Sequence, residues 1–216
     1  MMDASIALRM DDEELADQTR AIELALGFVG ALPGGSFLAA LIGQWSRVQA
    51  LRANTMINDL LGQLADQENG LVKRLQADPR VARLVWEASS AATTSETNAK
   101  LRALALVASR GILDDAALDE ARYLIDVLRQ LEVIDVRLLL AIEAQHLAPE
   151  TGLNTSAALG VTPGVAESIN AKLLQLAIVE APGMSFRGLH AEVRLSPFGR
   201  EMLNTLRSCG QGDPLR

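Results

Sequence analysis

The chain has 216 residues, of which 49% are hydrophobic and only 3% aromatic, and its formal net charge is −7. Abundant alanine and leucine with widely spaced turn residues favour packed helices over a β-sandwich or barrel. Residues 1–134 hold 13 basic against 19 acidic groups and residues 135–216 hold 7 against 8, so neither part has the positive field of a general nucleic-acid binder.

Two terminal features bear on the compartment. Cys209 is the single cysteine, which excludes an internal disulfide and favours a reducing compartment. The N-terminal stretch MMDASIALRMDDEELAD has acidic residues where a secretion signal has lysine and arginine. We therefore expect a cytoplasmic protein.

The first predicted helices surround an uncharged run, residues 24–46. A helix over residues 14–32 ends at Pro33-Gly34-Gly35, and Ser36 can cap a second, long helix that continues through Val48 to Leu64. The uncharged run is long enough to cross a bilayer, but the break leaves two arms of roughly ten residues each. Three alternatives stay open: a buried helical hairpin, which these arguments favour, a membrane-inserting hairpin, and a straight span.

Three more helices are expected before residue 134. Asp78 caps the first of them and Pro79 occupies its first turn. The polar run at residues 93–95 begins the next, which Gly111 ends as a left-handed cap, and Asp114 begins the third. Apolar residues of this third helix recur at helical spacing and predict a packed stripe: Leu118, Ala121, Leu124, Ile125, Leu128 and Leu131.

Residues 155–180, TSAALGVTPGVAESINAKLLQLAIVE, carry the most specific pattern in the chain. A helix-turn-helix needs a first helix with small apolar residues, a tight turn and a second helix packed across the first. Ala157 and Leu159 supply the first helix, Gly160 the turn and Thr162-Pro163 the second start. The packing residues of the second helix are expected to be Val165, Ala166, Ile169 and Leu173.

The surrounding residues extend this pattern. A helix over residues 135–147 precedes it, and two short strands near residues 177–180 and 190–195 predict a hairpin after it. A last helix opens at residue 195 and runs through Leu206. In this order, residues 135–207 resemble the winged helix-turn-helix domains of bacterial regulators similar to the MarR and ArsR families.

The resemblance implies a DNA-reading second helix and a wing that reaches the neighbouring groove. The residues that fall at these positions are Thr162, Ser168, Asn170 and Lys172 on the second helix, Arg187 at the hairpin tip, and Arg194, with Arg200 as a further backbone contact. Glu167 departs from the pattern because its carboxylate would repel phosphate. The alternative for each of these cations is a solvated surface charge.

The N-terminal part resembles bacterial helical proteins of the Abi-alpha type, which are associated with prophages and abortive infection. The likeness rests on the glycine-rich hairpin and on EASSAATTSETNAKLRALALVASRGILDD, followed by the leucine stripe. It implies no catalytic residues.

No motif for enzymatic chemistry is present: the sequence has no glycine-rich phosphate loop, nucleophile elbow, paired cysteines or HExxH helix. Glu143 and His146 lie one helical turn apart, but a di-iron bundle needs a second such pair and two more glutamates. We therefore expect no enzyme, no metal and no cofactor.

These observations predict a mainly α protein with three parts: a helical bundle over residues 1–133, a winged helix over 134–208 and a flexible tail over 209–216. A continuous helix is expected to join the first two near residues 131–135. The favoured function is a bacterial DNA-binding regulator that binds double-stranded DNA through its winged helix and uses its N-terminal bundle to dimerise, as a homodimer, or to sense a partner. The alternative is a non-enzymatic protein-interaction module of a phage-defence or prophage system, in which the winged helix docks a protein. Membrane association through residues 24–46 is a further, less favoured alternative.

Overall fold

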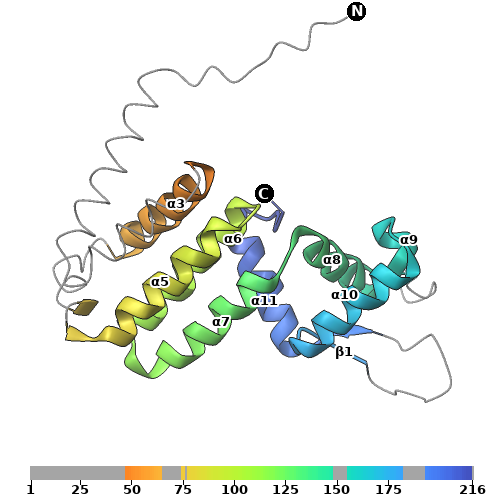
Figure 1. The fold of residues 1–216 in the computed structure, drawn as a ribbon. Helices are drawn as coiled ribbons and strands as arrows, with labels where there is room; N and C mark the ends of the chain where they lie inside the picture. Colours follow the sequence, from red (N-terminus) through yellow and green to blue (C-terminus); the bar gives the residue numbers. More distant parts are fainter. Residues whose placement is uncertain (1–46, 65–73, 76, 148–154, 182–192, 216) are drawn as a thin grey trace, which may run out of the picture.

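The structure is a computed structural model, and it describes residues 47–64, 74–75, 77–147, 155–181 and 193–215. The described part is mainly helical, with a small antiparallel sheet of two strands (Figure 1). Its elements are α3 (Arg47–Gln63), α5 (Pro79–Thr93), α6 (Asn98–Leu113), the 3-10 helix η2 (Asp115–Ala117), α7 (Leu118–Gln130), α8 (Val133–Leu147), α9 (Thr155–Leu159), α10 (Pro163–Gln175), β1 (Val179–Glu180), β2 (Arg194–Leu195) and α11 (Pro197–Cys209).

Helices α3, α5, α6 and α7 pack side by side, and local sequence signals position most of their ends (Figure 1). Asp78 accepts a hydrogen bond from the Arg80 amide at the start of α5, with Pro79 in the first turn, as predicted. Asp114 likewise accepts from the Ala116 amide at the start of η2. The predicted stripe of α7 is confirmed, since Leu118, Ile125 and Leu128 are buried.

Two predicted helix ends are wrong. Thr93 is the last residue of α5, and the cap of α6 is Thr97, whose hydroxyl accepts from the Lys100 amide. Gly111 does not end α6, which continues to Leu113. A Cβ at Gly111 would lie 2.7 Å from the Cβ of Ala121 and 2.8 Å from Cδ2 of Leu84, so this glycine permits close packing of α6 on its neighbours.

Apolar residues at helical spacing in the sequence predict a buried stripe along α3 that includes Val48, Leu60 and Leu64. This stripe is confirmed toward the C-terminal end of α3 and wrong at Val48. Leu60 and Leu64 are buried, together with Met56, whereas Val48 is 58% exposed. Val48 lies outside the row of side chains that α3 turns toward α5 and α6. The predicted helix over residues 14–32 and the hairpin of residues 24–46 lie outside the described residues.

The predicted continuous helix between α7 and α8 is wrong. α7 ends at Gln130, and Leu131 has an extended backbone, with φ −73° and ψ 128°. Glu132 precedes α8, and its amide donates to Oδ2 of Asp135 at 2.7 Å, which is one half of a capping box. Neither glycine nor proline is needed for this break, because a side chain three residues into α8 satisfies the free amide.

Helices α8 to α11 and the two strands follow the predicted order (Figure 1). Gly160 joins α9 to α10 with a φ of +65°, the left-handed region that favours glycine. Beyond α10, Val179 pairs with Leu195 and Glu180 with Arg194 in the antiparallel sheet. Ser196 then caps α11 by accepting from the Gly199 amide.

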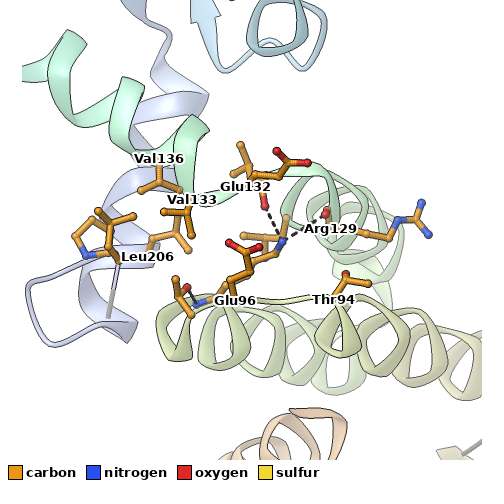
Figure 2. Close-up of a pocket in the computed structure, with 13 residues that line it drawn as sticks. Thr94, Glu96, Arg129, Glu132, Val133, Val136 and Leu206 are labelled. Atoms are coloured by element: carbon orange, nitrogen blue, oxygen red, sulfur yellow. Dashed lines mark hydrogen bonds between the residues drawn. The ribbon is translucent and has the colours of Figure 1, made fainter. Parts of the chain in front are cut away.

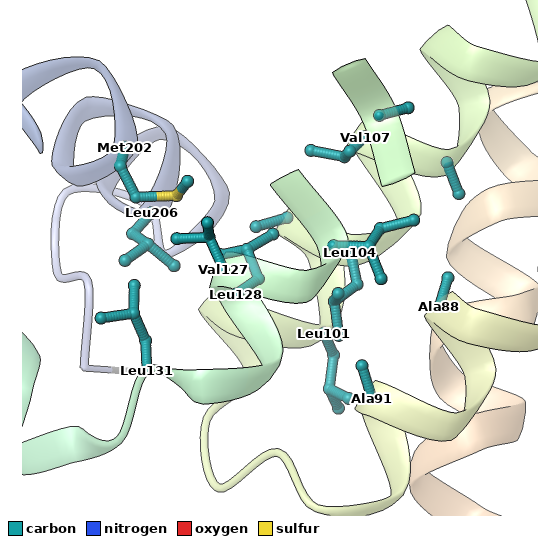
Figure 3. Close-up of a cluster of buried hydrophobic side chains, with 14 of the residues drawn as sticks. Ala88, Ala91, Leu101, Leu104, Val107, Val127, Leu128, Leu131, Met202 and Leu206 are labelled. Carbon is teal, nitrogen blue, oxygen red and sulfur yellow. The ribbon is translucent and has the colours of Figure 1, made fainter. Parts of the chain in front are cut away.

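One hydrophobic core connects these elements. In Figure 3, Met202 and Leu206 of α11 face Val127 and Leu128 of α7. The same cluster of buried residues reaches from α3 to α11 and includes Ile169 of α10. Helix α11, which the sequence assigns to a separate winged-helix domain, also packs directly on α6.

The predicted flexible tail is packed as far as it is described, up to Leu215. The Gly210 amide donates to the Leu206 carbonyl and the Gly212 amide to the Arg207 carbonyl, each at 2.8 Å. Pro214 is buried and Leu215 packs against the core. Within the described ranges, no helix combines the length and the apolar character needed to cross a membrane.

Candidate functional site

Helix α10 turns one side to the core and one to solvent. Ala166, Ile169 and Leu173 are buried, as predicted. Val165 was predicted to pack with them and is 45% exposed, because it lies beside that stripe rather than in it. The exposed residues that follow Pro163 define what we name the α10 face: Gly164, Val165, Glu167, Ser168, Ala171, Leu174 and Gln175.

The α10 face is nearly uncharged. Glu167 is the one charged residue among its seven members. Small residues, Gly164, Ser168 and Ala171, lie one turn apart at its centre, and the larger Val165 and Leu174 lie at its two edges, with Leu174 38% exposed. The surface is therefore one that another apolar or neutral surface can approach closely.

The predicted polar contacts of α10 occupy different environments. Thr162 precedes the helix, is exposed and makes no side-chain capping hydrogen bond. Ser168 is exposed. Asn170 is half-buried, and its Oδ1 has no hydrogen-bond partner among the described residues. Of these three, Thr162 and Ser168 are accessible to a large ligand.

Lys172, the predicted cation of α10, is held by the α7–α8 junction. Its Nζ lies 2.5 Å from Oδ2 of Asp135 and donates to the Gln130 carbonyl at 3.3 Å. The Asp135 side chain is completely buried, whereas that of Lys172 is 30% exposed. A buried carboxylate without its cation is costly, so Lys172 has a structural task that competes with phosphate binding.

The remaining predicted cations lie at the sheet and beyond it. Arg194 donates to Glu180 at 2.8 Å across the two strands. Arg200 donates to the Leu195 carbonyl at 2.9 Å. Arg187 lies outside the described residues. The structure thus brings Thr162, Ser168 and Asn170 together on or beside one helix, and it pairs Lys172 and Arg194 internally.

A second feature is a cavity of about 270 Å³ beside the α7–α8 junction, which we name the junction cavity (Figure 2). In Figure 2, Val133, Val136 and Leu206 lie on one side, and Glu96 and Glu132 lie toward the other. The full lining is Thr94, Glu96, Thr97, Lys100, Leu128, Arg129, Leu131, Glu132, Val133, Val136, Leu206, Pro214 and Leu215.

Lys100 of α6 forms part of the polar wall of the junction cavity. Its Nζ donates to the Leu131 carbonyl at 2.6 Å and to the Arg129 carbonyl at 3.3 Å (dashed lines in Figure 2). Burial lowers the pKa of Lys100 to about 8, although the carboxylates of Glu132, Glu96 and Asp135 oppose that shift. The ammonium therefore binds the carbonyls at the end of α7 in place of water.

Two other residues that the sequence analysis considered for chemistry, Glu143 and Cys209, have structural environments that explain them. Glu143 accepts from Arg207 at 2.9 Å, and this hydrogen bond lowers the pKa of Glu143 despite partial burial. The described residues contain no group of three or more His, Cys, Asp or Glu side chains that could hold a metal ion. Burial raises the pKa of the Cys209 thiol, which disfavours a reactive thiolate.

The residues that sequence reasoning missed are Lys100 and Asp135. Asp135 has a detectable signal, since it stands three residues after Glu132 at a helix start, the spacing of a capping box. Lys100 has none, because its burial depends on α7 ending beside α6. Comparisons of the chain with protein-family models, with curated proteins and with solved structures gave no match.

Proposed function

We propose that residues 133–209 form a winged helix-turn-helix module that binds a protein partner through the α10 face. The observation that supports this proposal most directly is the composition of the face: it has one charged residue, Glu167, and it exposes Val165 and Leu174 at its edges. Exposed apolar patches mark interaction sites, and the centres of protein interfaces are depleted in charged residues.

The order of elements supports the winged-helix part of the proposal. A short helix, a glycine turn at positive φ, a second helix, an antiparallel ribbon and a further helix follow one another in the described residues. In this arrangement the second helix is presented to solvent along its length. The arrangement itself suits DNA and protein equally well, so the proposal rests on the chemistry of the exposed surface.

The surface chemistry disfavours DNA. Affinity for a duplex comes largely from cations that neutralise phosphates. Lys172 is paired with buried Asp135 and Arg194 with Glu180. Glu167 adds a carboxylate on the side that would enter the groove. DNA binding is the second candidate, favoured by the turn at Gly160 and by the accessible hydroxyls of Thr162 and Ser168.

The proposal predicts a cross-linked partner at the α10 face. A photo-reactive amino acid replaces Ser168 in the full chain, and a matched variant carries it at Asn204, an exposed residue of α11. Irradiation of the native host cells is expected to give a protein adduct at position 168 and not at 204. The captured protein, once purified, is titrated against the wild-type chain and against Ala171→Glu, which is expected to bind at least about tenfold more weakly.

A DNA-binding measurement distinguishes protein docking from DNA binding. A labelled random-sequence duplex of about 30 base pairs is titrated at low salt, where phosphate contacts are strongest. We expect weak binding that is unchanged by Ala171→Glu. Tight, salt-sensitive binding that Ala171→Glu and Lys172→Ala both weaken would favour the DNA-binding function instead. Equal adducts at positions 168 and 204, or a partner indifferent to Ala171→Glu, would contradict protein docking.

A further inference from the structure

The junction cavity has an apolar wall and a separate acidic edge. Leu128, Leu131, Val133, Val136 and Leu206 supply its apolar surface. Its volume is slightly below the range of about 300–1,000 Å³ that is usual for small-molecule sites. A cavity of this size suits a short alkyl chain or a single ring.

The acidic edge consists of Glu96 and Glu132, which reach the cavity from the turn before α6 and from the α7–α8 junction. Both are exposed, and within the described residues neither side chain takes part in a salt bridge. Both carboxylates nevertheless act electrostatically on Lys100. They are therefore close enough to the same space to act on a ligand charge.

The cations at the cavity are already engaged. Lys100 directs two of its donors to the Leu131 and Arg129 carbonyls. The Arg129 guanidinium points away from the cavity in Figure 2 and pairs with Asp126. With two carboxylates against one ammonium, the site carries net negative charge, which favours a cation over an anion.

We propose that the junction cavity binds a small amphipathic organic cation, with its ammonium group between Glu96 and Glu132 and its apolar group against Val133, Val136 and Leu206. The site differs from the α10 face and does not depend on the function proposed for it. One wall of the cavity is the α7–α8 junction. In the same junction, the Gln130 carbonyl and the Asp135 carboxylate bind Lys172 of α10. A ligand here contacts the segment that anchors α10.

Three probes of similar size and different charge test the proposal by calorimetric titration of the full chain: 2-phenylethylammonium, 2-phenylethanol and 3-phenylpropanoate. The ammonium compound is expected to bind most tightly and at least about tenfold more tightly than the carboxylate, because the two glutamates attract an ammonium group and repel a carboxylate. Glu96→Gln with Glu132→Gln is expected to weaken the ammonium compound by about tenfold and to leave the alcohol unchanged.

Two further variants locate the site. Val133→Phe fills the cavity and is expected to weaken all three probes, whereas Glu120→Gln, an exposed change on α7 outside the lining, is expected to weaken none. If Val133→Phe fails to fold, the double glutamine variant on exposed positions still decides the outcome. Tighter binding of 3-phenylpropanoate, an ammonium affinity indifferent to the double variant, or no heat of binding with the ammonium probe would overturn the proposal.

Discussion

At the scale of single residues, the end of α7 is held by two lysines from distant parts of the chain. Lys100 of α6 binds the Arg129 and Leu131 carbonyls, and Lys172 of α10 binds that of Gln130. The last carbonyls of a helix lack intrahelical partners and carry partial negative charge, so ammonium groups stabilise them. Both lysines therefore have a structural role.

Lys100 gives the residue-scale prediction, a dependence of stability on pH. Its pKa falls from 10.5 to about 8 on folding because of burial. Between these values the unfolded chain keeps a proton that the folded chain has lost, so the free energy of unfolding contributed by Lys100 rises as pH increases from about 8 to 10.5. Below about 8 both states are charged and the contribution is constant.

The measurement is urea unfolding of the wild type and of Lys100→Met at several pH values between 7 and 11. Other titrating groups, Cys209 among them, are common to both proteins and cancel in the difference. The stability of the wild type relative to Lys100→Met is expected to increase across this interval. A difference that stays flat would show that Lys100 titrates alike in the folded and unfolded chains.

The environment of Lys172 could not be predicted from the sequence. The sequence offers Lys172 as a phosphate contact, since the winged-helix resemblance places it on the second helix. Its partner Asp135 lies 37 positions earlier and is completely buried at the start of α8, where Lys172 of α10 reaches it. Pairing of that kind depends on tertiary structure, which no local pattern records.

At the scale of elements, local chemistry predicted most helix starts and failed where packing decides. Asp78, Asp114 and Ser196 cap helices because each side chain satisfies a nearby amide. Gly111 was predicted to end α6 because glycine is common after helices. Its role is instead to fit α6 against Ala121 and Leu84, which is a property of three helices together.

This role gives the element-scale prediction. Gly111→Ala is expected to destabilise the protein by about 1–3 kcal/mol, because its Cβ would lie 2.7 Å from that of Ala121 and force the helices apart. The matched control is Gly62→Ala in α3, where a Cβ meets nothing within 4 Å. There the better helix propensity of alanine is expected to add up to about 1 kcal/mol. Urea unfolding of both variants checks the opposite signs, and stabilisation by Gly111→Ala would contradict the packing role.

At the scale of the whole molecule, the described helices share one core across the predicted boundary at residue 133. The sequence suggests two domains because the helix-turn-helix pattern begins after it. The leucines of α11 look like the inner side of a domain in either case, and only the packing shows that they face α7. Met202 and Leu206 fill the space beside Val127 and Leu128, so the final helix completes the N-terminal bundle (Figure 3).

This shared core predicts unfolding as one unit. Hydrogen exchange read by mass spectrometry along a urea series is expected to give the same midpoint for peptides from α5 and from α10. Met202→Ala is expected to cost about 2–5 kcal/mol, since Met202 is buried at the contact, and to lower both midpoints equally. The exposed change Asn204→Ala, two residues further along α11, serves as the control and is expected to move neither. Helices α5 and α10 lie seventy residues apart in the sequence, from Thr93 to Pro163, and only a common core couples their unfolding. Separate midpoints, or a loss of protection in α10 with α5 unaffected by Met202→Ala, would therefore mean that residues 134–208 unfold as an independent domain.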